Sequence, residues 1–374
     1  MSRGLRNSAT VIGLAVLPLL LLVLFLASRG YAFDFEAFWQ AGKAVRGGRS
    51  PYPDPHTVDF ARALAATSSY ENHFEFVYPA PALVSFVPLS LLPFGVAAGI
   101  FTALGITAIV ASLRLLDVRD WRCYGAAFLW FPTLYAVRLG TVTPLLVLGL
   151  AAAWRYRDRR WIAAPALAAI VIAKVFLWPI LLWFAATRRT GTAVLAAAGG
   201  AVVTAAAWAV VGFDTLRDYP ALLGKLSSAV QGESYSPVAL GLSIGLPPAA
   251  ARVLAVAVGV AALLGVVALA RRPDGDRLSF LAALAACFAF TPIVWNHYFA
   301  LLLVPIAVAR PRLSPLWFVP ALFWTPPESD AIAWKIALTL AVVALALVLA
   351  GRTPSAAAHG LRRSTRRGKL LGAS

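Results

Sequence analysis

From Tyr78 to Ala350 the chain is nearly all apolar, and many of its apolar runs are separated by short turns rich in arginine, with one longer segment at residues 212–247. Hydrophobic residues make up 60% of its 374 residues and charged residues only 13%, about half the share of a soluble domain. A single soluble core cannot hold this much apolar surface, and a disordered chain needs low hydrophobicity. Because the runs do not alternate with polar residues, they disfavour a membrane β-barrel. The sequence therefore predicts an all-α, polytopic transmembrane protein.

The apolar runs vary in length. Several have about 13 residues, fewer than the ~20 that cross a bilayer as a straight helix. Such runs indicate broken, tilted or re-entrant helices, which membranes tolerate where the backbone lines a cavity. We expect about 10–13 membrane helices, some of them short or re-entrant. The runs are residues 11–27, 78–92, 94–113, 122–137, 142–154, 161–173, 175–187, 190–211, 249–270, 278–291, 295–309, 313–325 and 333–350.

The first run follows Arg3 and Arg6. It has the pattern of a signal peptide, but no small-residue cleavage site follows it, so we expect a first transmembrane helix with a cytosolic N-terminus. The longest polar stretch comes next, at residues 29–77. Within it, residues 34–46 (DFEAFWQAGKAVR) have the spacing of an amphipathic interfacial helix, and residues 47–55 are rich in Gly and Pro, which is typical of a loop.

The net charge of +17 would indicate nucleic-acid binding in a soluble chain. Here the excess lies in turns between apolar runs, so it predicts topology, and we expect no nucleic-acid partner. By the positive-inside rule these turns and both termini are cytosolic, and loop 29–77 is extracytoplasmic. We expect one membrane domain over residues 1–351 and a basic tail without fixed structure, at 352–374, near anionic lipid headgroups. The basic clusters lie at residues 114–122, 155–160, 188–189, 271–277, 310–312 and 352–369.

This topology makes two segments leave the cytosolic side and return to it. Residues 161–187 reverse near Lys174, and residues 278–309 reverse near Trp295, Asn296 and His297. Residues 78–154 contain four apolar runs where an odd number of crossings is required, so one run is re-entrant or two runs form one crossing. The sequence does not distinguish these alternatives.

Three ionisable residues are predicted to share the extracytoplasmic side. They are Asp34, Lys174 and His297. Ionisable groups at membrane depth are energetically costly and therefore mark candidate functional sites. Each also has a structural explanation: Asp34 as an interfacial charge, Lys174 as a side chain that extends to the surface, and His297 as a buried packing residue.

A carboxylate, an ammonium and an imidazole together suit transfer of a group from a lipid phosphate. The carboxylate takes a proton from an acceptor hydroxyl, the ammonium stabilises charge on the departing phosphate, and the imidazole bonds sugar or phosphate. Aromatic residues nearby would stack on sugar or form an interfacial belt; they are Trp39, Tyr52, Tyr78, Trp178 and Trp295. The scattered histidines and the two cysteines form no metal-ligand pattern, so we expect no metal or other cofactor.

Four segments resemble glycosyltransferase family 87. Residues 34–54 resemble its first outer loop, and residues 76–94 resemble its Tyr-Pro-Pro segment. Residues 139–183 resemble its middle block, including the lysine near the end of that block. Residues 290–305 (FTPIVWNHYFALLLVP) resemble its Ser-Pro-x-x-Trp-x-His segment, with Thr291 in place of Ser and Tyr298 where a second His is common.

The resemblance implies a GT-C fold with an extracytoplasmic site and an inverting transfer of a sugar, mannose in the first instance, from a polyprenyl-phosphate donor. It implies a lipid-linked or glycan acceptor, with Asp34 as general base and His297 assisting. The predicted substrate-binding residues are Lys174, Tyr78, Trp295, Asn296, Tyr52 and Arg138. The sugar, acceptor and linkage stay open. A transporter or flippase for lipid or saccharide and an envelope scaffold are the alternatives, although no internal repeat of the transporter kind is evident.

Overall fold

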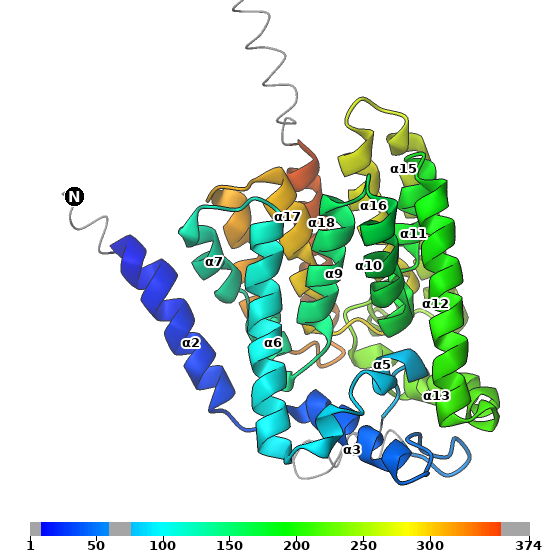
Figure 1. Ribbon diagram of the computed structural model, residues 1–374. Helices are drawn as coiled ribbons and strands as arrows, with labels where there is room; N and C mark the ends of the chain where they lie inside the picture. The colour runs from blue at the N-terminus through cyan, green and yellow to red at the C-terminus, as the bar shows by residue number, and fades with distance from the viewer. Residues whose placement is uncertain (1–8, 60–75, 353–374) are drawn as a thin grey trace, which may run out of the picture.

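The computed structural model describes residues 9–59 and 76–352 (Figure 1), and the predicted tail at 353–374 lies outside them. Within the described residues every regular element is a helix, as the sequence predicted. The helices are η1 (Ile12–Val16), α2 (Leu17–Leu26), α3 (Phe33–Arg46), α5 (Ala80–Val84), η2 (Leu89–Leu91), α6 (Phe94–Leu115), α7 (Trp121–Phe128), α8 (Phe131–Leu139), α9 (Thr143–Arg155), α10 (Arg160–Ala173), η3 (Val175–Leu177), α11 (Pro179–Ala186), α12 (Thr190–Val211), α13 (Phe213–Val230), η4 (Gln231–Glu233), α14 (Pro237–Ser243), α15 (Pro248–Ala270), α16 (Gly275–Phe290), η5 (Asn296–Leu302), α17 (Leu303–Ala309), η6 (Pro315–Trp324) and α18 (Ala333–Arg352).

Five helices among the described residues are long and apolar enough to cross a bilayer. They are Ala9–Leu26, α6, α12, α15 and α18. Their outward-facing side chains are aliphatic: Val202 on α12 is 69% exposed, and Val253 and Leu264 on α15 are 68% and 66% exposed. Apolar patches of this extent face lipid in a stable protein. The chain is therefore a multi-pass membrane protein.

The other apolar helices are short or bent, as their run lengths predicted. Helices α8 and α9 meet at an angle of 119°. The bend is at Gly140, which has φ +67, and a Cβ atom there would lie 2.6 Å from Cβ of Phe35. Only glycine fits both the left-handed backbone and this close approach.

One end of the bundle collects the basic turns, and we call it the basic end (Figure 1). It comprises the turns after α6, α9, α11, α15 and α17 and the end of α18. Contacts join these turns to one another: Arg155 pairs with Asp117 at 3.1 Å, and the Leu313 amide donates to Asp120 at 3.1 Å. The arginine clusters of the described residues therefore lie on one side of the bundle.

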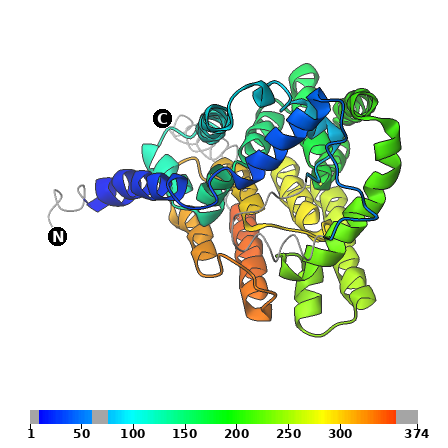
Figure 2. The same cartoon turned by 90° about the horizontal axis from the view of Figure 1, so that it is seen from below.

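The opposite end carries α3, α5 and α13, which lie across the ends of the longer helices (Figure 2). Helix α3 matches the predicted amphipathic helix: Phe35 and Phe38 are fully buried. Side chains of α3 also hold the apolar run at residues 78–92, because Arg46 donates to the Ser90 carbonyl and Trp39 donates to the Leu92 carbonyl. Residues 78–92 are therefore held against α3, and this run contributes none of the five long apolar helices.

Two helical hairpins enter the bundle from the basic end. In the first, α10 leads through Lys174 into η3 and α11; in the second, α16 leads through residues 291–295 into η5 and α17. The Asp276 carboxylate joins their bases, since it pairs with Arg157 at 2.9 Å and Arg189 at 2.7 Å. The hairpins are thereby fixed side by side, with their reversal points directed toward the α3 end.

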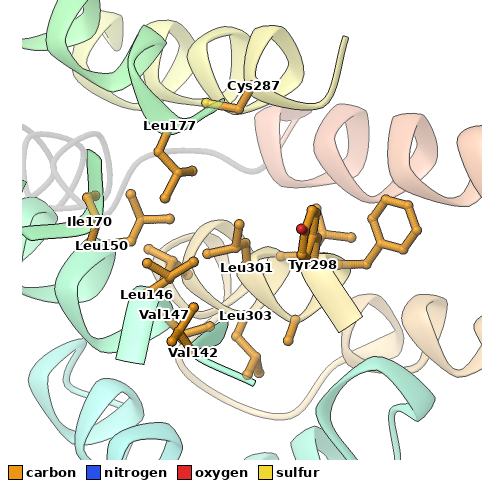
Figure 3. Packing of buried hydrophobic residues seen from close by; sticks show 14 of the residues in the cluster. Val142, Leu146, Val147, Leu150, Ile170, Leu177, Cys287, Tyr298, Leu301 and Leu303 are labelled. Carbon is orange, nitrogen blue, oxygen red and sulfur yellow. The ribbon is translucent and has the colours of Figure 1, made fainter. Parts of the chain in front are cut away.

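A buried apolar core supports the reversal points (Figure 3). Leu146, Val147 and Leu150 of α9, with Val142 directly before this helix, face Leu301 and Leu303, and Tyr298 lies in the same cluster. The 0% exposure of Leu301 and Leu303 shows that η5 and α17 are core elements although they are short. The core therefore fixes the position of the polar residues at the start of η5.

Candidate active site

Asp34 lies in the first turn of α3, where the helix dipole favours a carboxylate. The helix start is fixed by α8, which lies beside it: the Ala32 amide donates to the Arg138 carbonyl at 2.7 Å, and the Arg138 guanidinium donates to the Arg29 carbonyl. Ala32 has a left-handed backbone, φ 58, that turns the chain into α3. Arg138 therefore holds the turn that places Asp34.

Lys174 lies at the break between α10 and η3, in an extended conformation that ends α10. Its Nζ atom donates to the Tyr298 hydroxyl at 2.7 Å and lies 3.8 Å from the centroid of the Tyr78 ring. The tips of the two hairpins are thus joined, and the ammonium has a cation–π partner from the segment before α5. This position explains why a charge is tolerated here, and it contradicts the alternative in which Lys174 extends freely to the surface.

Asp34, Lys174 and the two tyrosines form one electrostatic group. Asp34 interacts with Lys174, and its charge also acts on Tyr78 and Tyr298. Burial raises the pKa of the Asp34 carboxyl from 3.8 to about 6, although the Lys174 charge opposes this shift. A carboxyl with a pKa near neutrality is well suited to take and release a proton.

His297 is 3% exposed and lies beside Lys174 in this group. Its ring is 4.7 Å from that of Tyr298 and 6.2 Å from that of Tyr135, centroid to centroid. Neither ring nitrogen has a hydrogen-bond partner among the described residues. Buried polar atoms are normally bonded, so both nitrogens are free for a ligand.

Asn296 is adjacent to His297 and shares this property. Its Nδ2 atom donates to the Pro326 and Pro327 carbonyls at 3.4 Å, whereas its buried Oδ1 atom has no partner among the described residues. Trp295, which precedes η5, is half-buried against the core. The predicted residues 295–297 therefore include one anchored group, Nδ2 of Asn296, and two polar groups without a partner among the described residues, Oδ1 of Asn296 and the His297 imidazole.

Tyr52 contacts Tyr78, whose ring in turn lies against the Lys174 ammonium. Its hydroxyl donates to the Tyr78 carbonyl at 2.8 Å, and its ring stacks on Trp208 at 5.6 Å. Tyr52 supports the cation–π partner of Lys174, much as Arg138 supports Asp34. Both were predicted to bind substrate, and the contacts seen here are with protein groups.

Tyr298 was not predicted as a site residue. Its hydroxyl accepts from Lys174, and its ring stacks on Phe176 at 5.1 Å. The available signal was its place directly after His297, at a position where a second histidine is common in the resembling family. A hydroxyl acceptor across 124 residues of chain leaves no local pattern in the sequence.

The geometry brings together one carboxyl, one ammonium, two phenol rings and one imidazole. Within residues 9–59 and 76–352, no three His, Cys, Asp or Glu side chains are grouped as metal ligands. The arrangement can take a proton at Asp34, place positive charge on an anionic group at Lys174, and bond a ligand at His297 and Asn296.

A sequence model of glycosyltransferase family 87 matches residues 76–294, more than half of the chain. The match contains Tyr78, Arg138 and Lys174. His297 lies just after its end, and Asp34 lies well before its start. Comparison with curated proteins and with solved structures gave no significant match.

Proposed function

The chain belongs to glycosyltransferase family 87, and we propose that this membrane glycosyltransferase moves a sugar, mannose in the first instance, from a polyprenyl-phosphate donor to a lipid-linked or glycan acceptor. The observation that carries the proposal is the convergence of Asp34, Lys174 and His297 from three separate elements. Family membership favours this function over the transporter and scaffold alternatives.

The proposed reaction is a single displacement at the anomeric carbon of the donor sugar. The acceptor oxygen attacks C1 while the bond between C1 and the phosphate oxygen breaks, so the configuration inverts. Asp34 takes the proton of the acceptor hydroxyl as the new bond forms. The electron pair of the broken bond leaves with the polyprenyl phosphate, whose added negative charge Lys174 stabilises.

His297 and Asn296 would hold polar groups of the substrates. A phosphate oxygen or a sugar hydroxyl bonded to His297 would satisfy a ring nitrogen that lacks a protein partner. Tyr78 and Tyr298 would keep the Lys174 ammonium in place, and Trp295 would present an apolar surface to a sugar ring.

The charge distribution supports an extracytoplasmic site. Because arginines gather at the basic end, the positive-inside rule assigns that end to the cytosol and the α3 end, with Asp34, to the other side. A donor whose polyprenyl chain lies in the bilayer would present its phosphate at this boundary, where Lys174 is located.

The decisive experiment is an assay of membranes with polyprenyl-phosphate-mannose and a panel of glycolipid acceptors. Asp34→Asn keeps the shape of the side chain but not its basicity, so transfer should fall by roughly 100-fold or more. Asp54→Asn is the matched control, since Asp54 lies exposed in the same outer loop. Full activity of a correctly folded Asp34→Asn protein would contradict the assignment of the base.

A further inference from the structure

A pocket of about 520 Å³ opens at the basic end, where α6 ends and α7 begins. Its lining includes Arg114, Asp117, Arg119, Trp121 and Tyr124, together with two valines. The lining residues lie at the end of α6 and the start of α7, whereas α3, which carries Asp34, lies at the other end of the bundle (Figure 1). It is therefore separate from the candidate active site.

The charge of the pocket is positive because the neighbouring acids have other partners. Asp117 pairs with Arg155, which lies outside the lining. Asp120, the next acid along the chain, accepts hydrogen bonds from Arg122 and from the Leu313 amide. Arg114 and Arg119 have no acidic partner within the described part of the chain, and both side chains are exposed.

Aromatic side chains form the apolar part of the pocket. Trp121 is 48% exposed, and exposed indole rings favour the headgroup level of a bilayer. Tyr124 is held in place because its hydroxyl donates to the Val118 carbonyl at 2.8 Å, and it interacts electrostatically with Arg114. Two exposed arginines without an acidic partner among the described residues, beside an exposed indole, fit a ligand that is anionic at one end and apolar at the other.

We propose that this pocket binds the headgroup of an anionic phospholipid. Arg114 and Arg119 bond the phosphate, since guanidinium groups match phosphate geometry, and Trp121 packs against the glycerol and upper acyl chain. The pocket would hold a structural or regulatory lipid on the face opposite the reaction. This assignment does not depend on the identity of the sugar or on the role of Asp34.

The test is native mass spectrometry of the full chain in detergent, titrated with phosphatidylglycerol or phosphatidylcholine. The double variant Arg114→Gln/Arg119→Gln should bind phosphatidylglycerol roughly tenfold more weakly or worse, because each surface arginine contributes to attraction of an anionic headgroup. Arg271→Gln/Arg272→Gln removes the same charge from the exposed α15–α16 turn of the same end and should bind as the wild type does. Circular dichroism confirms that both variants are folded.

Four outcomes would overturn the proposal. Equal weakening in the two double variants would mean diffuse attraction to the basic end, and equal retention would mean that the pocket holds no lipid. Competition by glycerol phosphate as strong as that by phosphatidylglycerol would identify a free phosphate as the ligand. Trp121→Ala should weaken lipid binding without changing glycerol phosphate binding, and an unchanged lipid affinity in this variant would also contradict the model of an amphiphilic ligand.

Discussion

Asp34 shows how the surroundings of a single residue set its pKa. Burial raises the pKa of its carboxyl to about 6, and only the deprotonated form can accept a proton. Transfer by the wild type should therefore fall as the pH is lowered through about 6. Replacing Lys174 by Met removes the charge that lowers this pKa, so the midpoint of the profile should move to higher pH.

The measurement is kcat/KM for transfer between about pH 4 and about pH 9. Lys225→Met, which removes an exposed cation on α13, should leave the midpoint in place. A wild-type profile that is flat through pH 6, or a midpoint that moves downward in Lys174→Met, would show that Asp34 is not the titrating base.

Tyr298 permits a second test at the same scale. Tyr298→Phe deletes the hydroxyl that accepts from Lys174 but keeps the ring that stacks on Phe176. Hydrogen bonds to charged groups contribute about 1.5–3 kcal/mol to stability, so the melting temperature should fall. The kcat/KM should also fall roughly tenfold or more, because Lys174 loses the contact that holds its ammonium in place. Tyr31→Phe, which loses a hydroxyl contact to Thr102 at 2.9 Å, is the control; equal losses in both would argue against a special role for Tyr298.

Among single residues, sequence reasoning found the charged groups but not their contacts. Asp34, Lys174 and His297 were detectable because each is an ionisable residue near apolar runs. The supporting roles of Tyr52 and Arg138 were not, since both depend on carbonyl groups, those of Tyr78 and Arg29. Such backbone pairings are set by tertiary packing and leave no mark on residue spacing.

At the scale of elements, the bend between α8 and α9 packs against α3, the helix that carries Asp34. Gly140→Ala would add a left-handed strain of about 1–2 kcal/mol and place Cβ against Phe35 of α3. We expect a lower melting temperature in detergent and a reduced rate of transfer, because α3 must move and carries Asp34 with it.

Gly99→Ala on α6 is the matched control, since no neighbouring atom lies within 4 Å of the added Cβ. It should leave the rate unchanged. If Gly140→Ala were equally silent, the contact between α8 and α3 would not determine the position of Asp34.

The positions of helices and chain reversals were predictable where the hydrophobic pattern was strong. The amphipathic segment at 34–46 became α3, and the reversals near Lys174 and His297 became hairpin tips. The fate of residues 78–92 was not predictable, because an apolar run that packs against α3 has the same composition as one that crosses. Hydrogen bonds from Arg46 and Trp39 hold this run against α3.

At the scale of the whole molecule, the gathering of arginines at one end predicts orientation in the membrane. Asp54→Cys at the α3 end should react with an impermeant maleimide added outside intact cells, and Arg272→Cys at the basic end should react only after permeabilisation. The native cysteines, Cys123 and Cys287, are both buried and should give little background. Labelling of Asp54→Cys from the cytosol alone would reverse the assigned orientation.

The joining of the two hairpin tips has a consequence for biosynthesis. Lys174 and Tyr298 are 124 residues apart, so the ribosome delivers the ammonium to the membrane well before its hydroxyl partner. Asp34 is delivered to the membrane earlier than Lys174, since α3 is among the first segments synthesised. Chains emerge N-terminal part first, and the reaction centre is complete only when residues from both hairpins have been inserted. A ribosome-stalled chain that ends before η5 would carry Asp34 and Lys174 but neither His297 nor Tyr298, so the candidate site would be incomplete in partly synthesised molecules.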